Sequence, residues 1–81
     1  MFWFTYILQS KTTGKYYIGS TNNKEKRVNE HNIGKNKSTR NKGPWETVYY
    51  EEFSSRMEAR RRELKIKSYK GGNAFKNLIT S

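Results

Sequence analysis

The first fifth of the chain is rich in aromatic and β-branched residues, a composition typical of β-strands. Residues 2–9 predict a first strand, and residues 16–20 predict a second. Residues 11–15 between them have the composition of a turn, in which Gly14 is free to adopt a positive φ. The pattern therefore predicts an N-terminal β-hairpin.

A polar segment with helix-capping chemistry follows the hairpin. Residues 21–23, Thr-Asn-Asn, offer N-cap side chains, and Glu25 falls in the first turn, where the helix dipole favours a carboxylate. Gly34 stands where a C-terminal cap is expected. These signals predict a helix over about 24–32. Residues 35–43 are basic, polar and without periodicity, which predicts a loop that ends at Pro44.

The second half of the chain predicts one more strand, one further helix and a final segment of short helix or coil. Residues 45–53 have strand composition, and Ser55 with Glu58 has capping-box spacing for a helix to about residue 68. Residues 73–80 predict a short helix or coil.

The helix predicted to end at about residue 68 has no single apolar stripe. Met57 and Leu64 point one way, whereas Ala59 and Ile66 point nearly the opposite way at 100° per residue. Periodicity alone therefore leaves the buried face of this helix open.

Size and composition limit the architecture. A chain of 81 residues, 32% of them hydrophobic, has room for one domain over residues 1–81, whose core must draw on its six Tyr, four Phe and two Trp. The element order predicts an α+β fold in which a thin sheet is covered by helices.

Charge indicates the class of partner. Seventeen Lys and Arg face seven Glu and no Asp, so the net charge is +10. Such a charge favours a polyanion, and nucleic acid is the usual one. A membrane surface is disfavoured, because no segment pairs a basic face with a clean apolar face. The absence of Cys excludes disulfides and thiolate sites, and the short apolar N-terminus is no signal peptide, so we expect a cytoplasmic protein.

Four side chains on the predicted hairpin and first helix could carry chemistry. Tyr6 and Tyr17 would approach one another across the hairpin, although strand tyrosines usually only pack. Arg27 and His31, four residues apart, share one helix face. Arginine can neutralise growing phosphate charge, and histidine suits proton transfer near neutral pH. The same pair would also fit a solvated face of a basic protein.

Glu63 on the second predicted helix is the fifth candidate. It shares a face with Ala59 and Ile66, and residues 60–62 before it are all Arg. A single carboxylate can anchor Mg²⁺, which keeps several waters and takes other ligands from substrate phosphate. An ion pair with a neighbouring arginine is the alternative.

Taken in order, these residues resemble the motifs of the GIY-YIG nucleases. The second motif of the family is intact at residues 17–19, Tyr-Ile-Gly. At residues 4–6 the sequence Phe-Thr-Tyr keeps only the Tyr of Gly-Ile-Tyr. Arg27 with His31 one turn later, and Ala59 with Glu63, match the next two signatures. A family asparagine is matched best by Asn77 and next by Asn73. The resemblance is greatest to small single-domain members, which have stretches similar to Thr-Arg at residues 39–40 and Gly-Pro-Trp at residues 43–45.

The resemblance implies a three-stranded antiparallel sheet flanked by helices, and hydrolysis of a phosphodiester by water. Glu63 would hold one Mg²⁺ or Mn²⁺, Tyr6 would be the general base assisted by Tyr17, and Arg27 would stabilise phosphorane-like charge, with His31 taking the proton in turn. Gly19 and Asn77 would support the structure of the site. The loop would bind the nucleic-acid backbone through Lys35, Lys37, Thr39, Arg40 and Lys42.

With no additional DNA-binding domain, the protein is expected to select DNA structure or ends rather than a long sequence, with DNA favoured over RNA. The alternative is a non-catalytic nucleic-acid-binding module of the same fold. A ribosome- or protein-associated basic adaptor has only the charge in its favour.

Overall fold

A computed structural model describes residues 2–37 and 39–80 of the chain. The elements run β-β-α-β-α-α along the sequence, and the last of them, for which the sequence left a helix or coil open, is a helix. Their bounds are β1 Trp3–Ser10, β2 Tyr16–Thr21, α1 Lys24–Asn32, β3 Trp45–Phe53, α2 Arg56–Lys67 and α3 Asn73–Thr80.

The strands form one antiparallel sheet in the order β2-β1-β3, so the predicted three-stranded α+β fold is confirmed. Gly14 turns the β1–β2 hairpin with φ of 76°, the conformation for which glycine is suited. In this hairpin Tyr6 lies opposite Gly19, and Thr5 opposite Ser20. Because successive strand residues point to opposite faces, these two pairs face opposite sides of the sheet.

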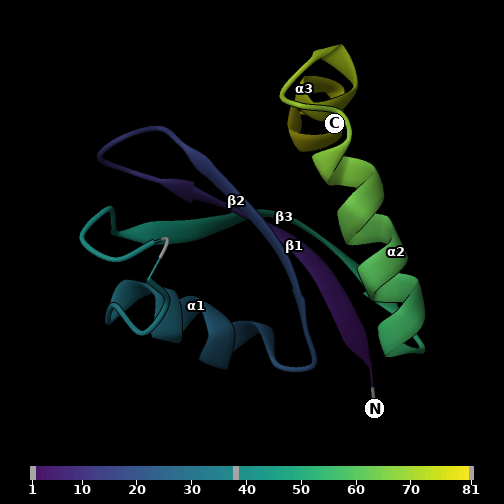
Figure 1. Cartoon of the computed structure of the whole chain (residues 1–81), viewed down its shortest axis with the longest axis horizontal. Helices are drawn as coiled ribbons and strands as arrows, with labels where there is room; N and C mark the ends of the chain where they lie inside the picture. Colours follow the sequence, from purple (N-terminus) through teal and green to yellow (C-terminus); the bar gives the residue numbers. More distant parts are fainter. Residues whose placement is uncertain (1, 38, 81) are drawn as a thin grey trace.

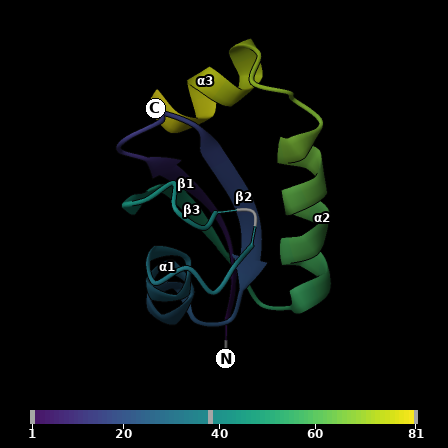
Figure 2. The same ribbon diagram turned by 60° about the vertical axis from the view of Figure 1, so that its left-hand side comes forward.

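Helices cover both faces of the sheet, α1 on one and α2 with α3 on the other (Figure 1). After a 60° turn the sheet is seen between α1 and α2, with α3 across one end (Figure 2). Tyr6, Leu8 and Trp45 form the core beneath α1. Ile7, which points the other way from β1, joins residues of α2 and α3 in a second cluster.

The buried face of α2 is the one that carries Ala59 and Ile66. Both are fully buried against the sheet, whereas Met57 and Leu64 are 69% and 52% exposed. The hydroxyl of Thr5 donates to the carbonyl of Ala59 at 2.6 Å, which joins the helix to the central strand. Tertiary contacts therefore decide a choice that periodicity left open, and Glu63 lies on the buried side.

The position of α1 is set at both of its ends. The side chain of Asn23 accepts from the backbone N–H of Lys26 and caps the helix N-terminus. At the other end the Asn32 side chain accepts from the Trp45 N–H at 2.6 Å and donates to the Trp45 carbonyl at 3.2 Å. These contacts bind the last residue of α1 to the first residue of β3. Within residues 2–37 and 39–80, no helix is long and apolar enough to cross a membrane.

Candidate active site

Tyr6 occupies the centre of the α1 side of the sheet, and its ring lies over Gly19. A Cβ added to Gly19 would stand 2.5 Å from the Tyr6 hydroxyl and 2.8 Å from Cζ, too close for any side chain. Glycine at this position of β2 therefore lets the phenol lie across the strand. Tyr6 itself is only 2% exposed.

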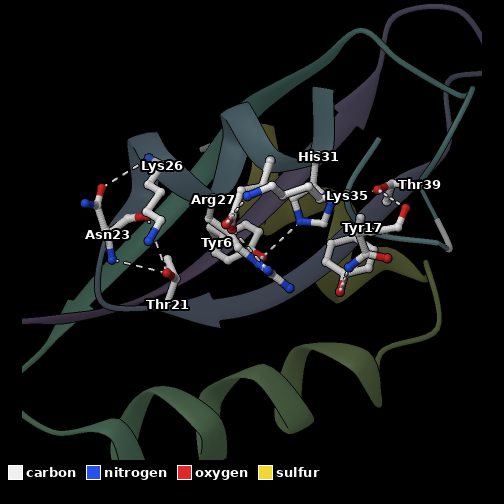
Figure 3. A network of polar contacts seen from close by, with 11 residues as sticks. Tyr6, Tyr17, Thr21, Asn23, Lys26, Arg27, His31, Lys35 and Thr39 are labelled. Atoms are coloured by element: carbon white, nitrogen blue, oxygen red, sulfur yellow. Dashed lines mark hydrogen bonds and ion pairs between the residues drawn. The ribbon is translucent and has the colours of Figure 1, made fainter. Parts of the chain in front are cut away.

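Two side chains of α1 meet the Tyr6 hydroxyl (Figure 3). The Arg27 Nε donates to it at 3.4 Å, and His31 Nε2 lies 3.3 Å from it. Arg27 and His31 reach the same atom because positions four apart project from one helix face. Arg27 is further held by Glu30, at 3.3 Å.

Tyr17 completes the aromatic part of the cluster. Its ring is stacked on that of Tyr6 with centroids 6.4 Å apart, and it lies 4.5 Å from the His31 ring. The Asn36 side chain donates to its hydroxyl at 3.3 Å. The structure therefore brings together four of the residues expected from sequence to form the site, from β1, β2 and α1.

Burial sets the protonation of this cluster at neutral pH. Burial raises the pKa of Tyr6 to about 12, although the hydrogen bond from Arg27 opposes it. Burial also lowers the pKa of His31 to about 4, and the charge of Arg27 acts in the same direction against that of Glu30. At pH 7 the phenol is protonated and the imidazole is neutral.

Thr39 lies elsewhere than expected. We expected it to contact nucleic acid with the basic loop, but it is 1% exposed and its hydroxyl lies 2.8 Å from His31 Nδ1. A side chain so buried does not reach a phosphate backbone. The loop therefore folds back on α1 here and contributes to the interior of the site.

Glu63 approaches β2 from the α2 side of the sheet. Its Oε1 accepts from the Ser20 hydroxyl at 2.8 Å, and its Oε2 is paired with Arg60 at 2.8 Å and Lys67 at 2.7 Å. Burial raises the pKa of Glu63, but the hydrogen bonds of Lys67 and Ser20 outweigh this and hold the pKa below its ordinary value. Ser20 is next to Gly19, so the ionised carboxylate and the Tyr6 phenol approach β2, an edge strand, at neighbouring residues.

The donor set suits a divalent ion held by one carboxylate. Among the described residues no three His, Cys, Asp or Glu side chains gather as a metal cage, so an ion here would keep waters and take phosphate oxygens. The two cations on Glu63 have side chains 57% and 48% exposed, so both can leave toward solvent when an ion binds. In the structure these two cations pair with the Glu63 carboxylate, whose side chain is 5% exposed, and a divalent ion would have to replace them.

The other expected residues lie outside this cluster. On the loop after α1, Lys35, Lys37, Arg40 and Lys42 are all exposed. Asn77 is exposed on α3, which packs through Phe75, Leu78 and Ile79 at the second core cluster. The structure does not bring Asn77 to Tyr6.

Sequence reasoning missed three side chains that support the site. Ser20 and Lys67 bind the Glu63 carboxylate, and Asn36 binds the Tyr17 hydroxyl. Lys67, four residues after Glu63, could have been found from helix spacing. The Ser20 contact, 43 residues apart in sequence, has no local signal.

Comparisons with known proteins identify the family to which the chain is similar. A family model described as the GIY-YIG catalytic domain matches residues 2–76. A UPF0213 protein of Clostridium perfringens is 46% identical over 65 residues, which are 79% of this chain and 69% of that protein. One from Staphylococcus haemolyticus is 43% identical over 67 residues, covering 82% and 80%. The solution NMR structure of a UPF0213 protein from Bacillus halodurans shares 34% identity over 93% of this chain and 92% of that one, with a TM-score of 0.49.

The matched span includes Tyr6, Tyr17, Arg27, His31 and Glu63, and it ends one residue before Asn77. A GIY-YIG catalytic domain indicates a nuclease, which acts on nucleic acid and typically uses a divalent metal. Because the family model matches residues 2–76, which are most of the chain, the chain belongs to the GIY-YIG family.

Proposed function

We propose that this protein is a metal-dependent endonuclease that hydrolyses phosphodiester bonds in DNA and selects DNA structure rather than sequence. The observation that carries the proposal is the buried contact of the Tyr6 hydroxyl with Arg27 and His31, next to the strand position where Glu63 is bound. Binding a phosphate would need only cations. A phenol, a neutral imidazole and a carboxylate around one strand are the groups of an acid–base reaction.

The proton path begins at the Tyr6 oxygen. That oxygen accepts one hydrogen bond from Arg27, which leaves it a lone pair for the attacking water. With pKa values of about 12 for Tyr6 and about 4 for His31, a phenolate–imidazolium pair is not populated at rest. The water proton therefore moves to Tyr6 while the Tyr6 proton moves to His31 Nε2, as the water oxygen bonds to phosphorus and the bond to the leaving oxygen breaks.

Arg27 acts on the charge that this step creates. Its side chain is 36% exposed, so the guanidinium can meet a substrate while Nε stays on Tyr6 and Nη1 stays on Glu30. A cation fixed in that place stabilises the pentavalent phosphorus as its negative charge grows. Tyr17 acts by packing, because its ring keeps those of Tyr6 and His31 in position.

Glu63 would hold the divalent ion. When bound, Mg²⁺ or Mn²⁺ supplies charge that polarises the phosphate and stabilises the leaving oxygen. The Glu63 carboxylate is ionised at neutral pH, as a metal ligand must be, and the Ser20 hydroxyl fixes its orientation.

DNA would be bound through the exposed cations of the loop after α1. Contacts between these side chains and phosphates carry no information about the base sequence, which supports selection of DNA structure. The preference for DNA over RNA is part of the proposal.

The test is cleavage of labelled single-stranded, duplex and branched DNA with Mg²⁺ or Mn²⁺. Glu63→Gln keeps the shape of the side chain and its contact with Ser20 but removes the charge. We expect cutting to fall on the order of 1000-fold, with binding retained. Glu46→Gln is the matched control, because Glu46 is an exposed β3 residue and the change in net charge is the same.

A Glu63→Gln variant that cuts at the wild-type rate would remove the metal role of Glu63. The alternative function, a binding module of the same fold, predicts tight, salt-sensitive binding that survives EDTA, and no cleavage of any of the substrates.

A further inference from the structure

The buried hydroxyl of Thr39 lies 2.8 Å from Nδ1 of His31, on the side of the ring opposite to Tyr6. Thr39 is 1% and His31 2% exposed, so water does not compete for this contact. The Thr39 backbone is itself fixed: its carbonyl accepts from the Trp45 indole at 3.1 Å, and its N–H donates to the Asn36 carbonyl at 3.2 Å. The hydroxyl is therefore held in place by the loop that contains it (Figure 3).

Counting donors and acceptors fixes the direction of the contacts. The Tyr6 hydroxyl has one proton to donate, and of its two described partners only His31 can accept it, because arginine has no acceptor. His31 Nε2 must then carry a lone pair. A neutral imidazole has its one proton on the other nitrogen, so Nδ1–H donates to the Thr39 oxygen. The Thr39 hydroxyl in turn lies 3.4 Å from the Asn36 carbonyl, to which it can donate.

We propose that Thr39 is a positioning residue that holds His31 in its Nδ1–H tautomer and so leaves Nε2 free to accept the proton of Tyr6. The proposal rests on the proposed function for its consequence in catalysis, but the tautomer exists without substrate. Thr39 would then act on the acid–base reaction through His31, the residue that receives the proton.

The role of the Thr39 oxygen continues during the reaction. When Nε2 receives the Tyr6 proton, the ring becomes an imidazolium whose two N–H groups both need acceptors. The Thr39 oxygen serves Nδ1–H before and after the transfer. Without it, a buried Nδ1–H would lack an acceptor, at a cost of about 1–3 kcal/mol. The Nε2–H tautomer would then be preferred, and His31 would donate to Tyr6 instead of accepting from it.

The tautomer can be read directly, because His31 is the only histidine in the chain. Tag-free full-length protein labelled with ¹⁵N-histidine gives a single pair of ring nitrogens in a long-range ¹H–¹⁵N correlation spectrum at pH 7. We expect the wild type and Thr39→Ser to show protonated Nδ1 and unprotonated Nε2. Thr39→Val, which keeps the shape and removes the hydroxyl, is expected to show protonated Nε2.

Cleavage kinetics test the consequence. We expect Thr39→Val to lower kcat on the order of 100-fold with little change in KM, and Thr39→Ser to restore most of the rate. Amide spectra of each variant report whether the fold is kept. If Thr39→Val does not fold, the wild-type and Thr39→Ser spectra decide the tautomer.

A wild-type spectrum with protonated Nε2 overturns the proposal, and so does a folded Thr39→Val protein that keeps protonated Nδ1. The proposed function can fail separately: a chain that cuts no DNA but shows the expected tautomers keeps Thr39 as the residue that orients His31. Conversely, if the protein cuts DNA but the His31 tautomer is the same in wild type and Thr39→Val, the proposed function stands and this inference fails.

Discussion

Tyr6 can occupy its position because Gly19, the residue opposite it on β2, has no side chain. Only hydrogen at Gly19 leaves room for the phenol, whose oxygen then meets both Arg27 and His31. The same ring stacks on Tyr17 and meets the His31 ring edge-on.

Gly19→Ala is therefore expected to displace Tyr6. A methyl group 2.5 Å from the Tyr6 hydroxyl must move the ring, at a cost of about 1–3 kcal/mol in the free energy of unfolding, and cleavage should fall with it. Urea denaturation and the cleavage assay measure the two effects. Gly72→Ala is the control, because Gly72 is exposed and the atom nearest to its added methyl group, the Tyr69 carbonyl oxygen, is 3.3 Å away rather than 2.5 Å. Equal activity of both variants would contradict the assigned position of Tyr6.

The buried neutral state of His31 predicts that stability depends on pH. The pKa of His31 is lowered from 6.5 to about 4 in the folded protein, so between these values the unfolded chain binds a proton that the native protein does not. The free energy of unfolding is then highest above pH 6.5 and falls as the pH drops toward 4, by up to about 3 kcal/mol. Urea midpoints measured from pH 7 to pH 4.5 test this. His31→Gln should remove the part of the slope above pH 5, and an unchanged slope would contradict the burial of a neutral imidazole.

At the scale of elements, the edge strand β2 joins the two halves of the site. Tyr17 and Gly19 lie on its α1 side, while Ser20 points toward α2 and holds Glu63. Arg27 and His31 are brought to the same place by α1, which itself depends on the contact of Asn32 with β3. Shifting α1 would therefore separate Arg27 and His31 from Tyr6 and from Glu63.

Asn32→Ala is expected to loosen α1 from the sheet. It removes two hydrogen bonds to the backbone of Trp45, and we expect a loss of about 1–3 kcal/mol in the free energy of unfolding, together with slower cleavage. Thermal or urea unfolding and the cleavage assay are the measurements. Asn29→Ala, an exposed change on the same helix, should leave both nearly unchanged. If the two variants behave alike, the Asn32 contact is not what positions α1.

For the molecule as a whole, the net charge of +10 favours a polyanionic partner, and the number of phosphates that its cations contact would set the salt dependence of binding. The exposed cations on the loop after α1 stand next to the buried Thr39–His31 contact, so DNA bound by the loop would lie beside the site. Arg40 is exposed, and its Nε donates to the Gly34 carbonyl at 3.0 Å, which fixes the direction of the side chain.

Arg40→Ala should weaken DNA binding to a similar extent for all sequences. If Arg40 contacts one phosphate, the slope of log K against log salt should become shallower by about 0.9 on duplex DNA. Binding titrations between low and moderate salt measure this slope. Lys76→Ala on α3 removes the same charge away from the loop and should leave the slope unchanged. An unaltered slope for Arg40→Ala would show that the loop does not touch phosphate.

The sequence by itself determined the elements and their order. The bounds of α1 and β3 are those predicted, because cap residues, Gly34 and Pro44 act within a few residues of themselves. The five residues proposed for catalysis were also named from sequence, through spacing and resemblance to the family, and the structure places Tyr6, Tyr17, Arg27 and His31 in contact.

Tertiary structure alone decided what depends on contacts between distant segments. It selected the Ala59 face of α2, gave Glu63 its partner in Ser20, buried Thr39 against His31, and left Asn77 on the outside. These outcomes follow from packing and from the need of each buried polar group for a partner, which no local pattern encodes. Local chemistry therefore fixed where the elements lie along the chain, and packing fixed which of their side chains meet.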